Sequence, residues 1–501
     1  MISTTLWVLL FAQMAMGAAD TIFHHELTQR LAWRPTAQFE LRLHGGRNLI
    51  YALVFLGIGM VQPGGALAWG LLALLGVETV ITLVDFVEED RTRQLPWTER
   101  VLHTLLTLNY GLVLALLVPV ILGWAADQSQ LVRVDHGWIS LAFVIAAIGV
   151  TISGVRDLLA ARRCTLLNQD NPAELVAAMG ARKAVLVTGG TGFIGTRLIA
   201  ALMGAGHDVT LLARDPAKAA RLGAPLRIIT SLAQMPPETS CDVVINLAGE
   251  PIANGLWTKA KRARILASRV DMTRNLLSWM AGLAHRPAVL VNGSAVGYYG
   301  LSKSDTPFDE GSPLGGGFSA HICAAWEGEA ALAEALGIRV VRLRIGLVLG
   351  HDGGMLGNLL FPFEAGLGGR IGSGRQWMSW IHRDDLVRLI GFVAGNDGVQ
   401  GAVNAVAPNP ERNAAFAAAL GKILNRPALL PLPAAPLRWL AGDLAEELLL
   451  GGQKVLPVKA VFAGFRFRYP HIEGALAKCV GKQCPTTDKH TAPLKAAHLL
   501  S

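Results

Sequence analysis

A glycine-rich turn between an apolar run and a helix-forming segment constrains the fold of this chain more than any other feature. Residues 184–187 are apolar and predict a buried parallel strand, and residues 193–203 predict a helix. The glycines Gly189, Gly192 and Gly195 follow the strand at GxxGxxG spacing. Glycine lets the backbone turn tightly and approach a pyrophosphate, which the N–H groups at a helix N-terminus then bind. The pattern predicts a dinucleotide-binding turn in an α/β Rossmann-like, doubly wound parallel sheet.

The first 160 residues are far more apolar than the rest of the chain. The 501 residues leave room for two or three domains, yet mean hydropathy is +0.40 and only 16% of residues are charged. Most of five apolar segments are long enough to cross about 30 Å of hydrocarbon, whereas the second is short and could extend through neighbouring residues. These segments are residues 4–23, 48–62, 66–86, 101–124 and 138–158. We predict an all-α transmembrane domain of about five helices over residues 1–160, and a polar linker over residues 161–181.

The arginines indicate how these segments would be oriented. They gather in the stretches before the second segment, before the fourth and after the fifth, whereas the two alternate loops hold one arginine in total. The positive-inside rule then puts the N-terminus outside and the soluble domain in the cytoplasm, as in a multi-pass protein of the cell inner membrane. The net charge of +8 has no long basic run, so nucleic acid is not an expected partner.

The five scattered cysteines fit a reducing compartment and no disulfide framework. Cys479 and Cys484 lie near His471 and His490, but the spacing matches no usual zinc site. We expect these four residues to belong to a solvated tail.

Carboxylates and histidines gather near the predicted cytoplasmic ends of the apolar segments. Three pairs have a spacing of four residues, which places both members on one helix face. The pairs are Asp20/His24, Glu40/His44 and Glu99/His103. They suit an Fe, Mn or Zn site in a helical bundle, but interfacial side chains that pair with arginines or cap helices show the same pattern. No metal ligand is therefore assigned. Glu78 lies deeper and is a candidate functional carboxylate.

Polar residues follow the ends of the next predicted strands, where ligands bind in a doubly wound sheet. The strand 208–214 ends in Arg214, a cation that suits the 2′-phosphate of NADP better than the ribose of NAD. A strand over 241–249 ends in Asn-Leu-Ala-Gly, and Arg269 on the following helix could turn inward. Further strands are predicted over 288–294 and 338–347.

Two other segments carry candidate chemistry. Ser294 ends its strand, where its hydroxyl could hydrogen-bond a substrate, and Tyr298 or Tyr299 could transfer a proton. The loop 371–385 combines glycines, aromatic residues and charge on the expected substrate side. Arg375 in this loop could hold an anionic group or be an ordinary surface arginine.

Several sequence words together resemble the atypical extended short-chain dehydrogenase/reductases, specifically the epimerase-like subfamily with a C-terminal domain of unknown function. They cover about residues 183–480 and not the apolar N-terminal part. They are Val187-Thr-Gly-Gly-Thr-Gly-Phe-Ile-Gly195, Asn246-Leu-Ala-Gly-Glu250, Ser268-Arg-Val-Asp-Met-Thr273, Trp326-Glu327, Gly372-Ser-Gly-Arg-Gln-Trp377, Trp380-Ile-His-Arg-Asp-Asp385, Asn404-Ala-Val-Ala-Pro-Asn-Pro410, residues 448–457 and residues 464–470. The resemblance implies an NADP-binding domain over 182–432, a C-terminal family-specific domain over 433–482 and a tail over 483–501.

The resemblance also implies which residues bind NADP(H) and which act on the substrate. Ser294 corresponds to the active-site Ser or Thr, and Tyr298 is the candidate acid/base. The implied cofactor-binding residues are Gly189, Thr191, Gly192, Phe193, Ile194, Gly195, Arg214, Leu247, Ala248, Arg269 and Leu347.

The usual catalytic Tyr-x-x-x-Lys of these enzymes is absent. Counting back from Glu327, Ser319 stands at the tyrosine position and Cys323 at the lysine position. Cys323 could be a nucleophile, but a small buried helix residue is the simpler interpretation. Two functions follow as expectations: a membrane-anchored NADP(H)-dependent oxidoreductase or epimerase-like enzyme with a small-molecule, possibly lipid-like substrate, or a non-catalytic NADP(H)-binding redox sensor. A metal-containing membrane module supplied by NADPH is a third interpretation.

Overall fold

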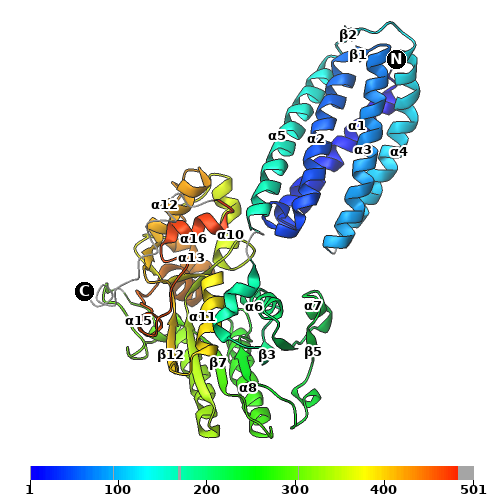
Figure 1. Ribbon diagram of the computed structural model, residues 1–501. Coiled ribbons are helices and arrows are strands. Elements are labelled where there is room, and N and C mark those ends of the chain that lie inside the picture. The colour runs from blue at the N-terminus through cyan, green and yellow to red at the C-terminus, as the bar shows by residue number, and fades with distance from the viewer. Residues whose placement is uncertain (1, 94, 168–170, 303, 483–501) are drawn as a thin grey trace. The chain divides into compact units, whose positions relative to one another are not determined.

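The computed structural model describes residues 2–93, 95–167, 171–302 and 304–482, which form two compact units. Unit 1 is Met1–Gln169 and unit 2 is Asp170–Ser501. Figure 1 shows unit 1 as a bundle of long helices and unit 2 as a sheet with helices on both faces.

Unit 1 is a bundle of five long helices, as the five apolar segments predict. α2 packs against α3 and α5, and α4 packs against α1 and α3. Apolar side chains fill the interior, where Trp7, Phe11 and Phe55 surround the ring of Phe143. The helices are α1 (Thr4–Ala19), α2 (Gln38–Gly59), α3 (Ala66–Thr92), α4 (Trp97–Ala125) and α5 (Trp138–Leu167).

The second segment extends through neighbouring residues on its N-terminal side, as its short length suggested, but ends earlier than predicted. α2 begins at Gln38, ten residues before the apolar stretch 48–62, and residues 61–63 form strand β1 (Val61–Pro63), which pairs with β2 (Leu131–Arg133). The first turns of α2 bury the polar side chains of Glu40 and His44 inside the bundle, so a search for apolar residues does not identify these turns as part of the helix. Among the described residues, four candidate spans are long and apolar enough to cross a membrane, and these include α1, α3, α4 and α5.

Unit 2 contains a seven-stranded, all-parallel sheet in the order β5-β4-β3-β6-β7-β8-β12. The chain proceeds outward from β3 on one side and then returns to β6 on the other, so the order switches between β3 and β6. The strands are β3 (Ala184–Thr188), β4 (Asp208–Leu212), β5 (Arg227–Ile229), β6 (Val243–Asn246), β7 (Val289–Ala295), β8 (Arg339–Ile345) and β12 (Gly401–Ala405). The doubly wound sheet is therefore confirmed, although β5 and β12 were not located by the sequence patterns.

Helices cover both faces because alternate residues of each strand point to opposite sides. Val185 and Val187 of β3 pack in the core with α6 (Phe193–Gly204) and α11 (Arg383–Gly395). Leu186 of the same strand packs in a second core with α8 (Lys259–Ala281) and α9 (Phe318–Ala331).

The expected linker is shorter than predicted, whereas the predicted tail over 483–501 lies outside the described residues. Residues Pro172–Met179 form a 3-10 helix, η4, which contacts α6 and α11 and buries Leu175, Val176 and Met179 in the core of unit 2. The apolar side chains of this segment make it part of the folded unit and not a polar linker.

The C-terminal region of unit 2 is mainly helical. Its elements are α13 (Ala434–Ala441), α14 (Asp443–Ala445), the π-helix η8 (Glu446–Leu450), α15 (Val458–Phe462) and α16 (Ile472–Cys479). α16 packs on α12 (Asn413–Leu424) and buries Cys479, so the expectation of a solvated tail is wrong for this residue. Cys484 and His490 lie outside the described residues.

Candidate active site at the carboxyl ends of the central strands

The glycine turn joins β3 to α6 in the conformation that its glycines permit. Gly189 has a φ of +72°, and a Cβ there would lie 2.6 Å from the carbonyl carbon of Leu247 on the neighbouring strand end. A Cβ on Gly195 would collide with the carbonyl oxygen of Gly189. Gly192 donates its N–H to that same oxygen at 3.0 Å, and no side chain in the described chain caps α6. The first turn of α6 is therefore arranged like a phosphate-binding helix N-terminus.

A cavity of about 450 Å³ lies beside this turn. Four of the predicted cofactor residues line it, namely Ile194, Leu247, Arg269 and Leu347, and so does the predicted catalytic residue Ser294. These residues are far apart in sequence but come together because parallel strands end at the same edge of the sheet. The cavity is thus a place where a cofactor and a substrate can meet.

The other predicted cofactor residues surround the cavity without being part of its lining. Arg214 is exposed after β4, and its charge acts on Glu250. Phe193 packs its ring near Gly353 and under the guanidinium of Arg383, 4.9 Å from the ring centre. Ala248 donates its N–H to Thr188 Oγ1 at 3.2 Å, and half-buried Thr191 stands on the turn itself. Their contacts to a cofactor stay a prediction.

A buried hydrogen-bond network fixes the strand ends beneath the cavity. Thr188 Oγ1 donates to Asn246 Oδ1 at 2.6 Å, and Asn246 Nδ2 donates to Asn292 Oδ1 at 2.7 Å. Asn246 Nδ2 and Trp326 Nε1 both donate to Thr273 Oγ1 at 3.0 Å. Each polar group is paired away from water, so the network holds β3, β6, β7, α8 and α9 in one arrangement.

Ser294 is held by an ion pair that the sequence did not reveal. Its Oγ donates to Glu327 Oε1 at 2.7 Å, and Arg344 binds both carboxylate oxygens of Glu327 at 2.9 Å. Arg344 also donates to the hydroxyl of Tyr299, which donates to Asn404 Oδ1 at 2.6 Å. Burial raises the pKa of Tyr299 to about 12 despite Arg344, so Tyr299 is a structural hydroxyl rather than an acid near neutral pH.

The two remaining tyrosine candidates are not equivalent to each other. Tyr298 lies flat against Arg344, with the guanidinium carbon 3.4 Å from its ring centre, and the cavity lining does not include it within the described chain. Tyr299, in contrast, is buried and does not reach the cavity. The acid/base role of Tyr298 stays a prediction, but its observed contact is a cation–π stack.

The two residues that the resemblance places at the tyrosine and lysine positions do line the cavity. Ser319 has a buried hydroxyl without a hydrogen-bond partner among the described residues, and it stands in the first turn of α9. Cys323 lies one turn later, and burial raises its pKa to about 11. The thiol is therefore protonated near neutral pH, which agrees with a small buried residue and disfavours a nucleophile.

The C-terminal region completes the wall of the cavity. Glu447 accepts hydrogen bonds from the N–H groups of Phe318 and Ser319, at 2.9 and 2.8 Å, and so caps α9. Gln376 of the predicted substrate-side loop donates to the carbonyl of Leu449 at 3.0 Å. This loop and the C-terminal region close the cavity together, whereas Arg375 is exposed and outside its lining as described.

Comparisons with known proteins find relatives of unit 2. Residues 185–405 match the family described as the NAD dependent epimerase/dehydratase family, and residues 432–479 match a domain of unknown function, DUF1731. The protein named "Epimerase family protein SDR39U1 homolog, chloroplastic" from Arabidopsis thaliana is 41% identical over 300 residues, which are 58% of this chain and 85% of that protein. "Epimerase family protein YfhF" from Bacillus subtilis is 36% identical over 59% of this chain and 97% of its own length.

A solved structure is similar as well. The human epimerase family protein SDR39U1, crystallised with NADPH, superposes with a TM-score of 0.55 and 36% sequence identity, over 59% of this chain and 99% of the human one. The resemblance predicted from the sequence words is thereby confirmed for the epimerase-like domain and its C-terminal domain of unknown function. This chain belongs to the NAD-dependent epimerase/dehydratase family.

Proposed function

We propose that the protein is a membrane-anchored, NADP(H)-dependent oxidoreductase or epimerase-like enzyme. The observation that carries this proposal is the cavity in which Ser294, Arg269 and Leu347 meet beside the glycine turn. The human relative that binds NADPH in its crystal structure supports the choice of cofactor. So does Arg214, since a cation after the second strand suits a 2′-phosphate.

The residues present fit a dinucleotide. A Cβ at Gly189 or Gly195 would strike backbone of Leu247 or of the turn itself, so only glycine permits this tight turn, and α6 offers N–H groups without a side-chain cap. When bound, NADP(H) supplies or accepts a hydride at its nicotinamide. Leu247 and Leu347 give the cavity apolar walls that exclude water from the reacting carbon.

Ser294 would orient the substrate rather than transfer a proton by itself. Its hydroxyl hydrogen is directed at Glu327, so the oxygen presents lone pairs to the cavity. In this state Ser294 accepts a hydrogen bond from a substrate alcohol. Arg344 keeps Glu327 in place from behind, so it acts as a positioning residue.

A non-catalytic NADP(H) sensor is the second candidate. It is favoured by Ser319 and the protonated Cys323, which stand where related reductases carry tyrosine and lysine. Neither side chain can lower the pKa of a neighbouring acid as a lysine does. A sensor would bind NADPH without consuming it.

The two candidates are separated by binding and turnover of NADPH in the full-length protein in mild detergent. Gly195→Ala should weaken binding by about tenfold or more, because the added Cβ strikes backbone. Gly204→Ala is the matched control on the same helix, where a Cβ has ordinary contacts at 3.5 Å. Reduction of NADP⁺ by alcohol substrates, with consumption of NADPH in the reverse direction, supports the enzyme if Ser294→Ala abolishes it while binding persists. Binding without consumption supports the sensor, and equal affinity of both glycine variants contradicts the cofactor site.

We further propose that unit 1 is a multi-pass anchor in the cell inner membrane, with unit 2 in the cytoplasm. The four apolar candidate spans and the arginine distribution support this. Proximity to the membrane would favour a lipid-like substrate. Protease added to sealed spheroplasts should leave unit 2 intact, and cleavage of unit 2 under these conditions would contradict the orientation.

A further inference from the structure

Histidine and carboxylate side chains from separate helices meet inside unit 1. They come from the π-helix η1 (Asp20–Thr28), from α2, from α3 and from α4. A π-helix has a wider turn than an α-helix, which brings side chains five residues apart onto one face, so Asp20 and His25 point the same way. The members of this cluster are Asp20, His25, His44, Glu89, Glu99 and His103.

We infer that unit 1 binds a divalent first-row transition metal through Asp20, His25, Glu99 and His103. Each offers one ligand atom, and these atoms lie within 4.8 Å of one another. The donor set has two imidazoles, two carboxylates and no thiolate, which suits Fe, Mn or Zn rather than Cu(I) or an alkaline-earth ion.

The distances among these atoms match the edges of a coordination sphere. Asp20 Oδ2 is 3.3 Å from His25 Nε2 and 3.2 Å from His103 Nε2, and His25 Nε2 is 4.0 Å from Glu99 Oε1. Metal–ligand bonds of about 2.0–2.2 Å place neighbouring ligands roughly 3.0–3.5 Å apart and opposite ones about 4.2 Å apart. A cation therefore fits between these atoms with little movement.

Two buried atoms of the cluster have close charged neighbours but no well-formed hydrogen bond. His25 Nε2 and Glu89 Oε2 make no hydrogen bond among the described residues, although Asp20 Oδ2 lies 3.3 Å from the first and His103 Nδ1 lies 3.4 Å from the second. His44 Nε2 differs, because it pairs with Asp85 Oδ2 at 2.9 Å. Poorly satisfied buried donor and acceptor atoms cost free energy, and a metal would accept the lone pairs of His25 and Glu89.

A second layer of side chains orients the ligands. Asp20 Oδ1 is 2.9 Å from His24 Nδ1, and His103 Nδ1 is 3.4 Å from Glu89 Oε2, the carboxylate–histidine arrangement common around metals. His25 stacks on His44 with ring centres 4.5 Å apart. His25 also forms an adjoining set with His44 and Glu89.

Arg93 pairs with three carboxylates, one of which is the proposed ligand Glu99, and so it cannot neutralise all of them. Arg93 binds Glu40, Glu89 and Glu99 at 2.8–3.1 Å. Among the described residues, Asp20 forms ion pairs only with histidines, which are charged only when protonated. One arginine shared among three carboxylates leaves excess negative charge, which favours a bound cation.

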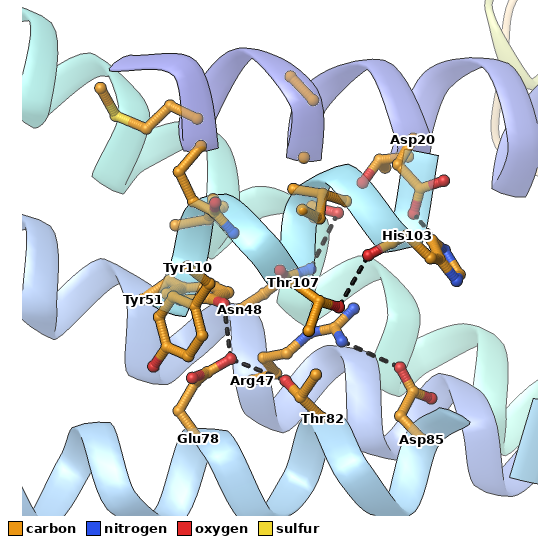
Figure 2. A pocket seen from close by; sticks show the side chains of 18 of the residues that line it. Asp20, Arg47, Asn48, Tyr51, Glu78, Thr82, Asp85, His103, Thr107 and Tyr110 are labelled. Carbon is orange, nitrogen blue, oxygen red and sulfur yellow. Dashed lines mark hydrogen bonds and ion pairs between the residues drawn. The ribbon is translucent and has the colours of Figure 1, made fainter. Parts of the chain in front are cut away.

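A cavity of about 460 Å³ adjoins the cluster and gives access to it. Asp20, Glu89 and His103 line it together with apolar side chains such as Phe55 and Phe86. Figure 2 shows Asp20 and His103 close together in this lining, away from Glu78 and Tyr51. Such surroundings suit an apolar molecule that enters from the bilayer and meets the metal.

The test uses the full-length protein in detergent, stripped with a chelator and titrated with Co²⁺, whose visible spectrum reports nitrogen and oxygen ligation. We expect at least about one tightly bound ion per chain, measured also by elemental analysis after desalting. His25→Gln and His103→Gln should each lower the affinity by at least about tenfold. His136→Gln is the control, since this histidine lies outside the cluster and packs on Trp7.

The outcomes decide the inference without reference to NADP(H). Loss of Co²⁺ binding in both cluster variants, with binding kept in the control, supports the site. A wild-type protein that remains folded and binds no Co²⁺ overturns it, as does equal binding by all three variants. If a cluster variant fails to fold, Glu89→Gln replaces it, and a roughly 10- to 100-fold weaker affinity is expected because only the second layer is changed.

Discussion

The ion pair behind Ser294 gives a stability prediction with a defined magnitude. The side chains of Glu327 and Arg344 are each 5% exposed, and two parallel hydrogen bonds of 2.9 Å join them. Burial lowers the pKa of Arg344, but Glu327 and Tyr299 more than offset this, so the guanidinium stays charged. Glu327→Leu removes the partner and leaves that charge buried. Breaking a buried pair in this way costs about 3–5 kcal/mol.

Thermal unfolding of the full-length protein, followed by tryptophan fluorescence, measures this cost. For a large domain about 2 °C corresponds to 1 kcal/mol, so the transition of unit 2 should fall by about 6–10 °C. The double variant Glu327→Leu with Arg344→Met leaves neither charge unpaired and should recover at least half of the loss. A single variant that loses less than about 1 kcal/mol, or a double variant that loses the sum of both singles, would refute this reasoning.

Three further predictions concern other residues of unit 2. Arg214→Ala should weaken NADPH binding about 10- to 100-fold, as measured by isothermal titration, because a charge-assisted hydrogen bond to the 2′-phosphate is lost. NADH binding should not change. Equal losses of affinity for NADPH and NADH would contradict the assignment of Arg214 to the 2′-phosphate. Burial lowers the pKa of His382 to about 4 in the folded protein. In the unfolded chain the same side chain takes up its proton near pH 6.5, so between these pH values the unfolded state binds more protons than the folded state. Stability should therefore fall by about 3 kcal/mol between pH 6.5 and 4 in urea titrations, and His382→Gln should flatten this slope; an unchanged slope contradicts it. Since burial raises the pKa of the Cys323 thiol to about 11, iodoacetamide should modify it at pH 7.5 far more slowly than glutathione, and a comparable rate by mass spectrometry would contradict its burial.

Local patterns predict the central sheet well because buried parallel strands are continuous apolar runs. β3, β6, β7 and β8 lie where the sequence places them, within a few residues at each end. β5 has three residues and β12 begins with Gly-Ala, so neither presents an apolar run of useful length. Their positions depend on pairing with β4 and β8, which sequence patterns do not contain.

The sequence predicts the site residues that lie at strand ends. It does not predict the site residues that depend on ion pairs between distant elements. Ser294, Leu247 and Leu347 share one cavity because each lies at the carboxyl end of a strand of the sheet or just after it. Arg344 points into the core from β8, and only its pairing with Glu327 makes it part of the site. No spacing rule connects two residues on different elements, so this pair had no sequence signal.

In the polar end of unit 1, too, the sequence predicts some contacts and misses others. The spacing of four residues correctly pairs Asp20 with His24. It does not identify His25, which faces the cluster because residues 20–28 form a π-helix. Glu40 and His44 contact different partners, Arg93 and Asp85, so a shared helix face was no guide to their contacts.

The most direct measurement of the central claim is native mass spectrometry of the full-length protein released from mild detergent with NADPH added. The glycine turn, Arg214 and the cavity at Ser294 predict one NADP(H) per folded chain, and Gly195→Ala should lose it while Gly204→Ala retains it. A folded wild-type protein that carries no dinucleotide at saturating NADPH would contradict the claim.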